Sequence, residues 1–203
     1  MQVHYFWMWF TILVVPALLL LLRWRAAKGE NSGISMVFLV DQRQPFEEHR
    51  VRAAARKIFD RPLINLDDNP DEFVCQTQEG MVSREFLIHV PQGTFVLKEQ
   101  SRPYFKKRTM EPPNPLQTAV SSHQGWFGLE LVSPPADVND RAQSYQWMCR
   151  FMAELADDSC LAFGCPELAR FLPFSQEIKS KLASPQALRL LENVLPHPTT
   201  EPH

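Results

Sequence analysis

The sequence is short of glycine, with only seven among its 203 residues. They form neither a P-loop nor a GxGxxG pattern, so the chain lacks the glycine-rich loops that commonly hold nucleotide phosphates. An excess of one charge is lacking too, because the net charge of -2 gives no electrostatic bias toward nucleic acid. Asn-x-Ser/Thr sequons are also absent, which is slightly unfavourable for a secreted glycoprotein.

The four cysteines match no disulfide framework in their spacing. They are Cys75, Cys149, Cys160 and Cys165. A structural zinc site prefers closer pairs than Cys160 and Cys165 and needs two further ligands, which no nearby Cys/His pair supplies. We interpret the four thiols as free and mostly buried, and we expect neither a metal nor a cofactor.

One long uncharged run is present, from Tyr5 to Leu22. Its 18 residues would span roughly 27 Å as a helix, enough for a thin hydrocarbon core. Aromatic and basic residues lie near the two ends of the run, as they do in membrane anchors: Trp7 and Trp9 at one end, and Arg23, Trp24 and Arg25 at the other. A cleaved signal peptide is the main alternative and fits poorly, because no positive region precedes the run. Residues 1–25 are therefore predicted to be an uncleaved transmembrane anchor.

The charges beside this run predict its orientation. Only His4 precedes it, whereas Arg23, Arg25 and Lys28 follow it. The positive-inside rule then places the C-terminal side in the cytoplasm. We expect a single-pass membrane protein, with the lipid bilayer as one partner and a cytoplasmic soluble domain.

Beyond a polar linker at residues 26–33, strand and helix patterns alternate. Apolar runs and period-two alternation predict strands at residues 34–40, 73–78, 81–90, 94–98, 125–133 and 160–165. Apolar stripes and capping residues predict helices at residues 45–59 and from about 137 to 156, and two more after Ser175 and Ser184. This order predicts an α+β domain over residues 34–195, a ferredoxin-like split βαβ sandwich with extra C-terminal helices packed at a sheet edge, and a disordered tail at residues 196–203.

Two segments suggest relatives: SSHQGWFGLELVS at residues 121–133 and DDSCLAFGCPELARFLP at residues 157–173. With the long helix between them, they resemble an uncharacterised bacterial family of ferredoxin-like α+β domains. The resemblance covers about residues 34–175. It implies the fold and carries over no functional residue, because the family has no established activity.

Glu130 is unusual because it interrupts an apolar strand. It is predicted to share a face of the sheet with Trp126, where it would form a paired-carboxylate site with Glu85 or be a solvated residue matched by Arg84 or a lysine. His123 lies at the entrance of the same strand. A membrane-bound hydrolase using His123, Glu130 and a cysteine is one hypothesis, and a hydrogen-bonding role for His123 is the simpler one.

A basic loop with interleaved aromatic residues follows the 94–98 strand. It contains Arg102, Tyr104, Phe105, Lys106, Lys107 and Arg108. Anionic lipid, a phosphorylated partner or RNA are possible ligands of such a loop, although a solvated loop is the simplest interpretation and no nucleic-acid partner is expected. The leading hypothesis is a non-enzymatic, membrane-tethered domain that binds a protein at the cytoplasmic face, through this loop or the face with Trp126 and Glu130. A subunit of a larger membrane assembly is the remaining alternative.

Overall fold

The computed structural model describes residues 34–42, 45–64, 69–105, 115–132, 137–166 and 170–191. The predicted anchor with its flanking tryptophans and arginines, the linker and the predicted tail lie outside these residues. Within the described ranges, no helix is long and apolar enough to cross a membrane. Chain contacts separate residues 1–33 from a second unit that starts at Ile34, and every described residue belongs to the second.

The fold is α+β, as predicted. The strands are β1 (Ile34–Val40), β2 (Phe73–Glu79), β3 (Ser83–Val90), β4 (Gly93–Gln100), β5 (Gly125–Leu131), β6 (Cys160–Cys165) and β7 (Arg170–Pro173). The helices are α2 (Glu48–Phe59), α3 (Pro115–Ser122), α4 (Val138–Leu155), α5 (Gln176–Ala183) and the 3-10 helix η2 (Pro185–Leu190).

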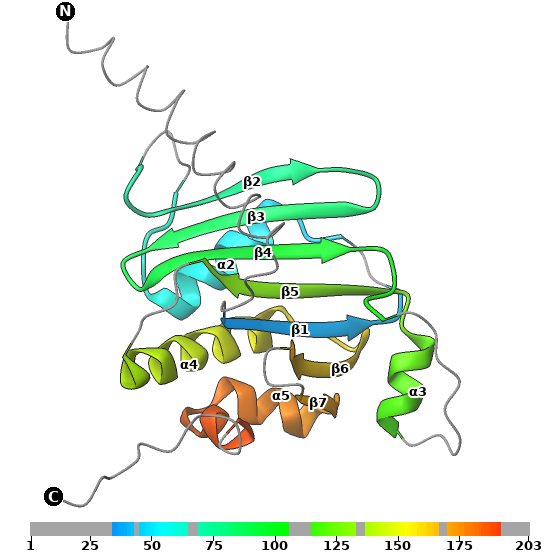
Figure 1. Cartoon of the computed structure of the whole chain (residues 1–203). Helices are drawn as coiled ribbons and strands as arrows, with labels where there is room; N and C mark the ends of the chain where they lie inside the picture. The colour runs from blue at the N-terminus through cyan, green and yellow to red at the C-terminus, as the bar shows by residue number, and fades with distance from the viewer. Residues whose placement is uncertain are drawn as a thin grey trace, which may run out of the picture. The chain divides into compact units, whose positions relative to one another are not determined.

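All seven strands form one sheet in the order β2-β3-β4-β5-β1-β6-β7, and each neighbouring pair is antiparallel (Figure 1). The strand at the start of the unit, β1, therefore lies between β5 and β6, which begin about 90 and about 125 residues later in the chain. Helix α2 connects β1 to β2 and helix α4 connects β5 to β6.

The main core lies between one face of the sheet and the layer of α2, α4, α5 and η2. Phe38 of β1 is at its centre, with ring centroids 5.2 Å from those of Phe127 and Phe163 and 5.4 Å from that of Phe174. Because successive strand residues point to opposite faces, Leu39 lies on the other side. There α3 covers the β6 and β7 part of the sheet through a smaller apolar cluster.

Three predicted details of the helices differ from the structure. Helix α2 begins at Glu48 rather than Pro45, because Phe46 enters the core and packs edge-on against Phe127. The segment after Ser184 is a 3-10 helix, although the predicted Ser184 cap is present. The C-terminal helices join the main helix layer instead of a sheet edge, since Leu182 and Leu191 are buried in the main core.

The sheet has one strand more than the sequence predicted. Strand β7 is short and ends at Pro173, and it pairs with β6 from Cys165–Arg170 to Ala162–Pro173. Four residues give too short an alternation to be read as a strand, so only the pairing with β6 defines it.

Candidate functional site

The two ends of the sheet differ in what they present. We call the end where β1 and β4 finish and β5 begins the distal end; it is marked by Val40, Gln100 and Gly125 (right in Figure 1). The opposite, proximal end is where β1 begins at Ile34, paired with Leu131. The preceding segment of the chain therefore joins this unit at the proximal end.

At the distal end, a row of aromatic rings crosses from β5 toward β7. The ring centroid of Tyr104 is 5.2 Å from that of Trp126 and 4.9 Å from that of Phe105, which is in turn 5.1 Å from Phe171. Gly164 makes this row possible, because a Cβ there would lie 2.3 Å from the Phe171 ring. We call these four residues the aromatic row.

His123 fixes the backbone that carries the row. Its Nε2 accepts hydrogen bonds from the backbone N–H groups of Tyr104 at 2.8 Å and Phe105 at 3.3 Å, and its Nδ1 donates to the carbonyl of Val120 at 2.6 Å. Burial lowers the pKa of His123, with an opposing contribution from the Val120 carbonyl. The imidazole is therefore a neutral, fully bonded structural group, and it connects α3 to the segment after β4.

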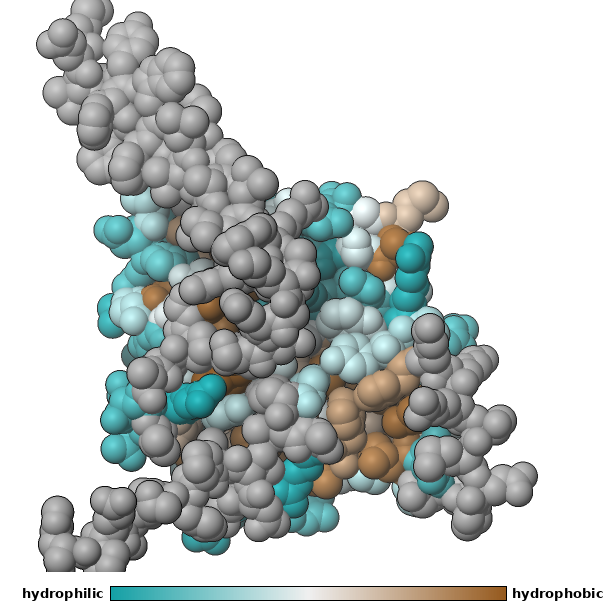
Figure 2. Space-filling model, viewed as in Figure 1, coloured by the Kyte–Doolittle hydropathy of each residue, from teal (hydrophilic) through white to brown (hydrophobic). Residues whose placement is uncertain are grey.

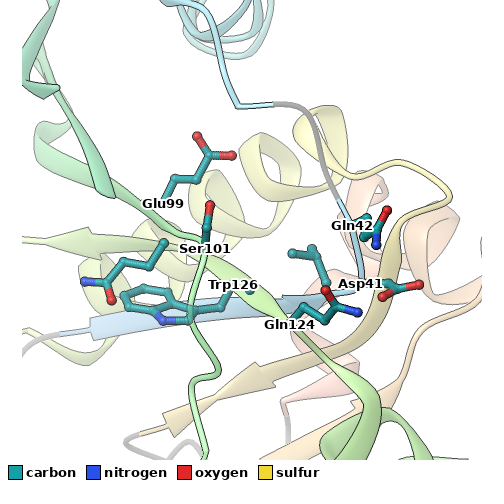
Figure 3. Close-up of a pocket in the computed structure, with 9 residues that line it drawn as sticks. Asp41, Gln42, Glu99, Ser101, Gln124 and Trp126 are labelled. Atoms are coloured by element: carbon teal, nitrogen blue, oxygen red, sulfur yellow. The ribbon is translucent and has the colours of Figure 1, made fainter. Parts of the chain in front are cut away.

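A pocket of about 300 Å³ opens beside Trp126 (Figure 3). Trp126, Ser101 and Glu99 lie on one side, and Gln124, Asp41 and Gln42 lie on the other. Its lining is mainly polar, and Glu99 already accepts a hydrogen bond from the Phe46 N–H at 2.9 Å. The pocket offers amides, a hydroxyl and carboxylates beside one indole, a composition suited to polar binding.

The exposed large apolar side chains of the described residues are Met81, Val82 and Tyr104, and all three lie at the distal end. Met81 is fully exposed in the turn between β2 and β3, where Figure 2 shows an apolar spot at the rim of a largely hydrophilic region. Ser101 connects this turn to the aromatic row, because its N–H donates to the Val82 carbonyl at 2.9 Å. Arg102 is exposed immediately after it.

Glu130 lies elsewhere, near the proximal end of β5. Its carboxylate pairs with Lys98 at 2.8 Å, and Lys98 is also directly opposite Glu85 in the register of β3 and β4. A lysine therefore lies between the two carboxylates of the predicted pair. The simpler prediction, in which a lysine matches Glu130, is confirmed, whereas Arg84 pairs with Glu79.

The three groups of the hydrolase hypothesis do not converge in the described residues. Gly125 and Glu130 are five strand residues apart, about 17 Å, and His123 precedes Gly125. Cys149 is buried on the helix side of the sheet, with its sulfur 3.8 Å from that of Met36, and burial raises its pKa to about 12. That thiol is a packing group, as the sequence indicated.

The structure therefore brings together part of the predicted binding residues. Trp126, Tyr104 and Arg102 share the distal end, Glu130 does not, and Lys106, Lys107 and Arg108 lie outside the described residues. Sequence reasoning missed Met81 and Val82. The sequence placed both residues in a strand predicted at residues 81–90, whereas β3 begins at Ser83 and the two residues lie exposed in the preceding turn.

No metal site is apparent in the part of the chain that the structure describes, because no three His, Cys, Asp or Glu side chains cluster suitably there.

Comparison with family models, curated proteins and solved structures finds no match to this chain. The resemblance to a ferredoxin-like bacterial family therefore stays a prediction.

Proposed function

We propose that this protein is a non-enzymatic, membrane-tethered interaction domain whose distal end binds a protein partner at the cytoplasmic face. Residues 1–25 would be the single-pass anchor and residues 26–33 the linker. The domain itself would be a ferredoxin-like sandwich with an enlarged sheet.

The strand order supports the ferredoxin-like assignment. Strands β6-β1-β5-β4 are adjacent in that order, with α2 following β1 and α4 connecting β5 to β6. That is the order of a split βαβ sandwich. Strands β2 and β3 would then be a hairpin added before the equivalent of its second strand.

The observation that carries the functional proposal is the grouping of exposed apolar and aromatic side chains at the distal end. Tyr104 is 36% exposed and Val82 is 41% exposed, beside the half-buried Trp126 and the exposed Arg102. Aromatic residues, Met and Arg are enriched in protein interfaces, and aromatic and Arg side chains dominate their binding energy. A surface of this composition beside a polar pocket suits a protein partner.

The linker joins the domain at the end of the sheet opposite the proposed binding surface. The linker reaches Ile34 at the proximal end, and β1 extends about 23 Å from there to the distal end. A fully extended eight-residue linker spans about 27 Å. A tether of this length would keep the domain within reach of the bilayer.

Site-specific photo-crosslinking in cells tests the proposal. A photoreactive phenylalanine replaces Tyr104 at the distal end or, as a control, the exposed Pro91 at the proximal end. We expect a discrete crosslinked protein from position 104 that is lost with Trp126→Ala and is absent from position 91. Equal crosslinking from both positions, or none from position 104, would refute the proposal.

The tether is tested separately by membrane fractionation. The full chain should remain in the membrane pellet after a carbonate wash, and protease added to sealed vesicles should reveal a cytoplasmic domain. Release by carbonate would refute the anchor and leave the distal contact to be judged by the crosslinks.

A further inference from the structure

The outer strand β2 carries an uncharged segment at an edge of the sheet. Residues 73–78 read FVCQTQ, with no charge, proline or glycine. Six-residue segments of this composition are prone to pair with other strands when they are exposed at an edge. Native proteins protect such edges with charges, prolines, bulges or covering elements, so β2 needs one of these protections.

Three outward backbone groups of β2 are already bonded. The Val74 N–H donates to the Ile64 carbonyl at 3.3 Å, and the Val74 carbonyl accepts from the Arg52 guanidinium at 3.4 Å. The Gln76 N–H donates to the Glu48 carboxylate at 3.1 Å. These are the groups that a further strand would need, because alternate residues of an edge strand direct their N–H and C=O outward.

Two of the three partners come from one helix. Glu48 and Arg52 are one turn apart on α2 and form an ion pair with each other, so the pair meets the strand as a unit. Their side chains are 35% and 19% exposed, far less than a typical surface pair. A register irregularity between Gln76 and Gln78 ends the regular edge just beyond them, and such a bulge also discourages strand pairing.

We propose that the Glu48–Arg52 pair takes the place of an eighth strand and closes β2 against strand addition. The charges that an edge strand usually carries are supplied by the neighbouring helix. When the pair is removed, the exposed edge becomes a self-association surface, and its occupant is β2 of a second copy, paired antiparallel. Two copies fit because the segment has no charge to repel its own copy.

The test uses the full chain in mild detergent. Glu48→Ala with Arg52→Ala opens the edge. Glu177→Ala with Lys181→Ala is the matched control, because it removes an i,i+4 ion pair of α5 whose side chains are 73% and 46% exposed. Hydrogen exchange at the Gln76 amide should become about tenfold faster in the edge variant, since that amide loses a charged acceptor. Sedimentation should show larger species than in the wild type or the control.

A short bis-maleimide identifies the surface involved. Cys75 lies within β2 and is half-buried, so paired edges from two copies bring two Cys75 thiols close together. We expect a crosslinked dimer of the edge variant that disappears when Cys75→Ser is added. A variant with wild-type sedimentation and no Cys75 crosslink would overturn the proposal.

If the double variant does not fold, the single variant Glu48→Leu provides the test. It removes both side-chain oxygens, so the Gln76 N–H loses its acceptor and Arg52 loses its ion-pair partner. Faster Gln76 exchange together with a Cys75 crosslink supports the proposal, and wild-type behaviour in both assays overturns it. Neither result depends on whether the distal end binds a partner.

Discussion

Replacement of His123 by alanine should release the segment that carries Tyr104. The imidazole accepts the N–H groups of Tyr104 and Phe105, and it donates to Val120. A buried N–H group left without an acceptor costs about 1–3 kcal/mol. The two N–H groups here are only partly buried, and the bond to Phe105 is the longer of the two at 3.3 Å. We therefore expect His123→Ala to lower the free energy of unfolding by about 2 kcal/mol.

The same site makes stability depend on pH. Burial lowers the pKa of His123 in the folded protein below its ordinary value of 6.5. The unfolded chain therefore binds the proton more readily, and stability rises with pH between the two pKa values. The contribution of the neutral imidazole is complete above about pH 6.5 and is lost as the pH falls toward the folded pKa. Protonation of Nε2 would also turn this acceptor into a donor that faces the Tyr104 N–H, so the hydrogen bond would be lost.

The pH dependence can be measured from about pH 7.5 to about pH 5 in two ways. Hydrogen exchange of the segment after β4 reports on local stability, and urea unfolding reports on the stability of the whole domain. The wild type should lose protection at the Tyr104 amide as the pH falls, and His123→Ala should abolish this dependence. His49→Ala is the control, because the ring of His49 is exposed. Protection that stays constant with pH, or an alanine variant as stable as the wild type, would refute the reasoning.

Three further substitutions or reagents probe the packing and the caps. Gly164→Ala should destabilise the domain by about 1–3 kcal/mol in urea unfolding, because its Cβ would lie 2.3 Å from the Phe171 ring, and Phe171→Ala should reduce that penalty. Cys149, with its pKa raised to about 12, should resist N-ethylmaleimide in the folded chain while the half-buried Cys75 reacts, as mass spectrometry would show. Asp137→Ala should cost about 1 kcal/mol and Asp137→Asn much less, because the side chain caps α4.

Much of the fold was predictable because the core pattern is strong. The run ISMVFLV is apolar at nearly every position, and β1 is the buried strand that it predicts, over the same residues 34–40. Cys160–Cys165 is likewise a strand over the predicted residues. The cap of α4 also lies at the predicted start of that helix, because the Asp137 side chain accepts the N–H groups of Asn139 and Asp140.

The candidate site was only partly predictable, because its contacts depend on register and on distant segments. Trp126 and Tyr104 were predicted separately, and their contact follows from the pairing of Gln100 with Trp126 in β4 and β5. Lys98 pairs with Glu130 across 32 positions, a separation that no local pattern encodes. The alternation that predicts a strand at residues 81–90 includes Met81, and only the pairing of Ser83 with Gln100 shows that the strand begins after it.

The small number of exposed apolar side chains leads to a last prediction. Among the described residues, helices cover one face of the sheet, and the Glu48–Arg52 pair bonds two outward groups of β2. Three large apolar side chains are exposed at the distal end, whereas each partner of a stable interface contributes roughly 20–30 residues. We therefore expect weak binding that depends on the high effective concentration supplied by the membrane tether.

The dependence of binding on the membrane tether can be measured with the crosslink from position 104. Replacing residues 1–25 with an unrelated single-pass anchor should preserve it, because the anchor would act only by confining the domain to the membrane. Cutting the linker at residues 26–33 with an inserted protease site should abolish it, while the released domain keeps the hydrogen-exchange protection of its sheet. A crosslink that persists equally after release would mean that the distal end alone supplies the affinity, and the tether would then need another role.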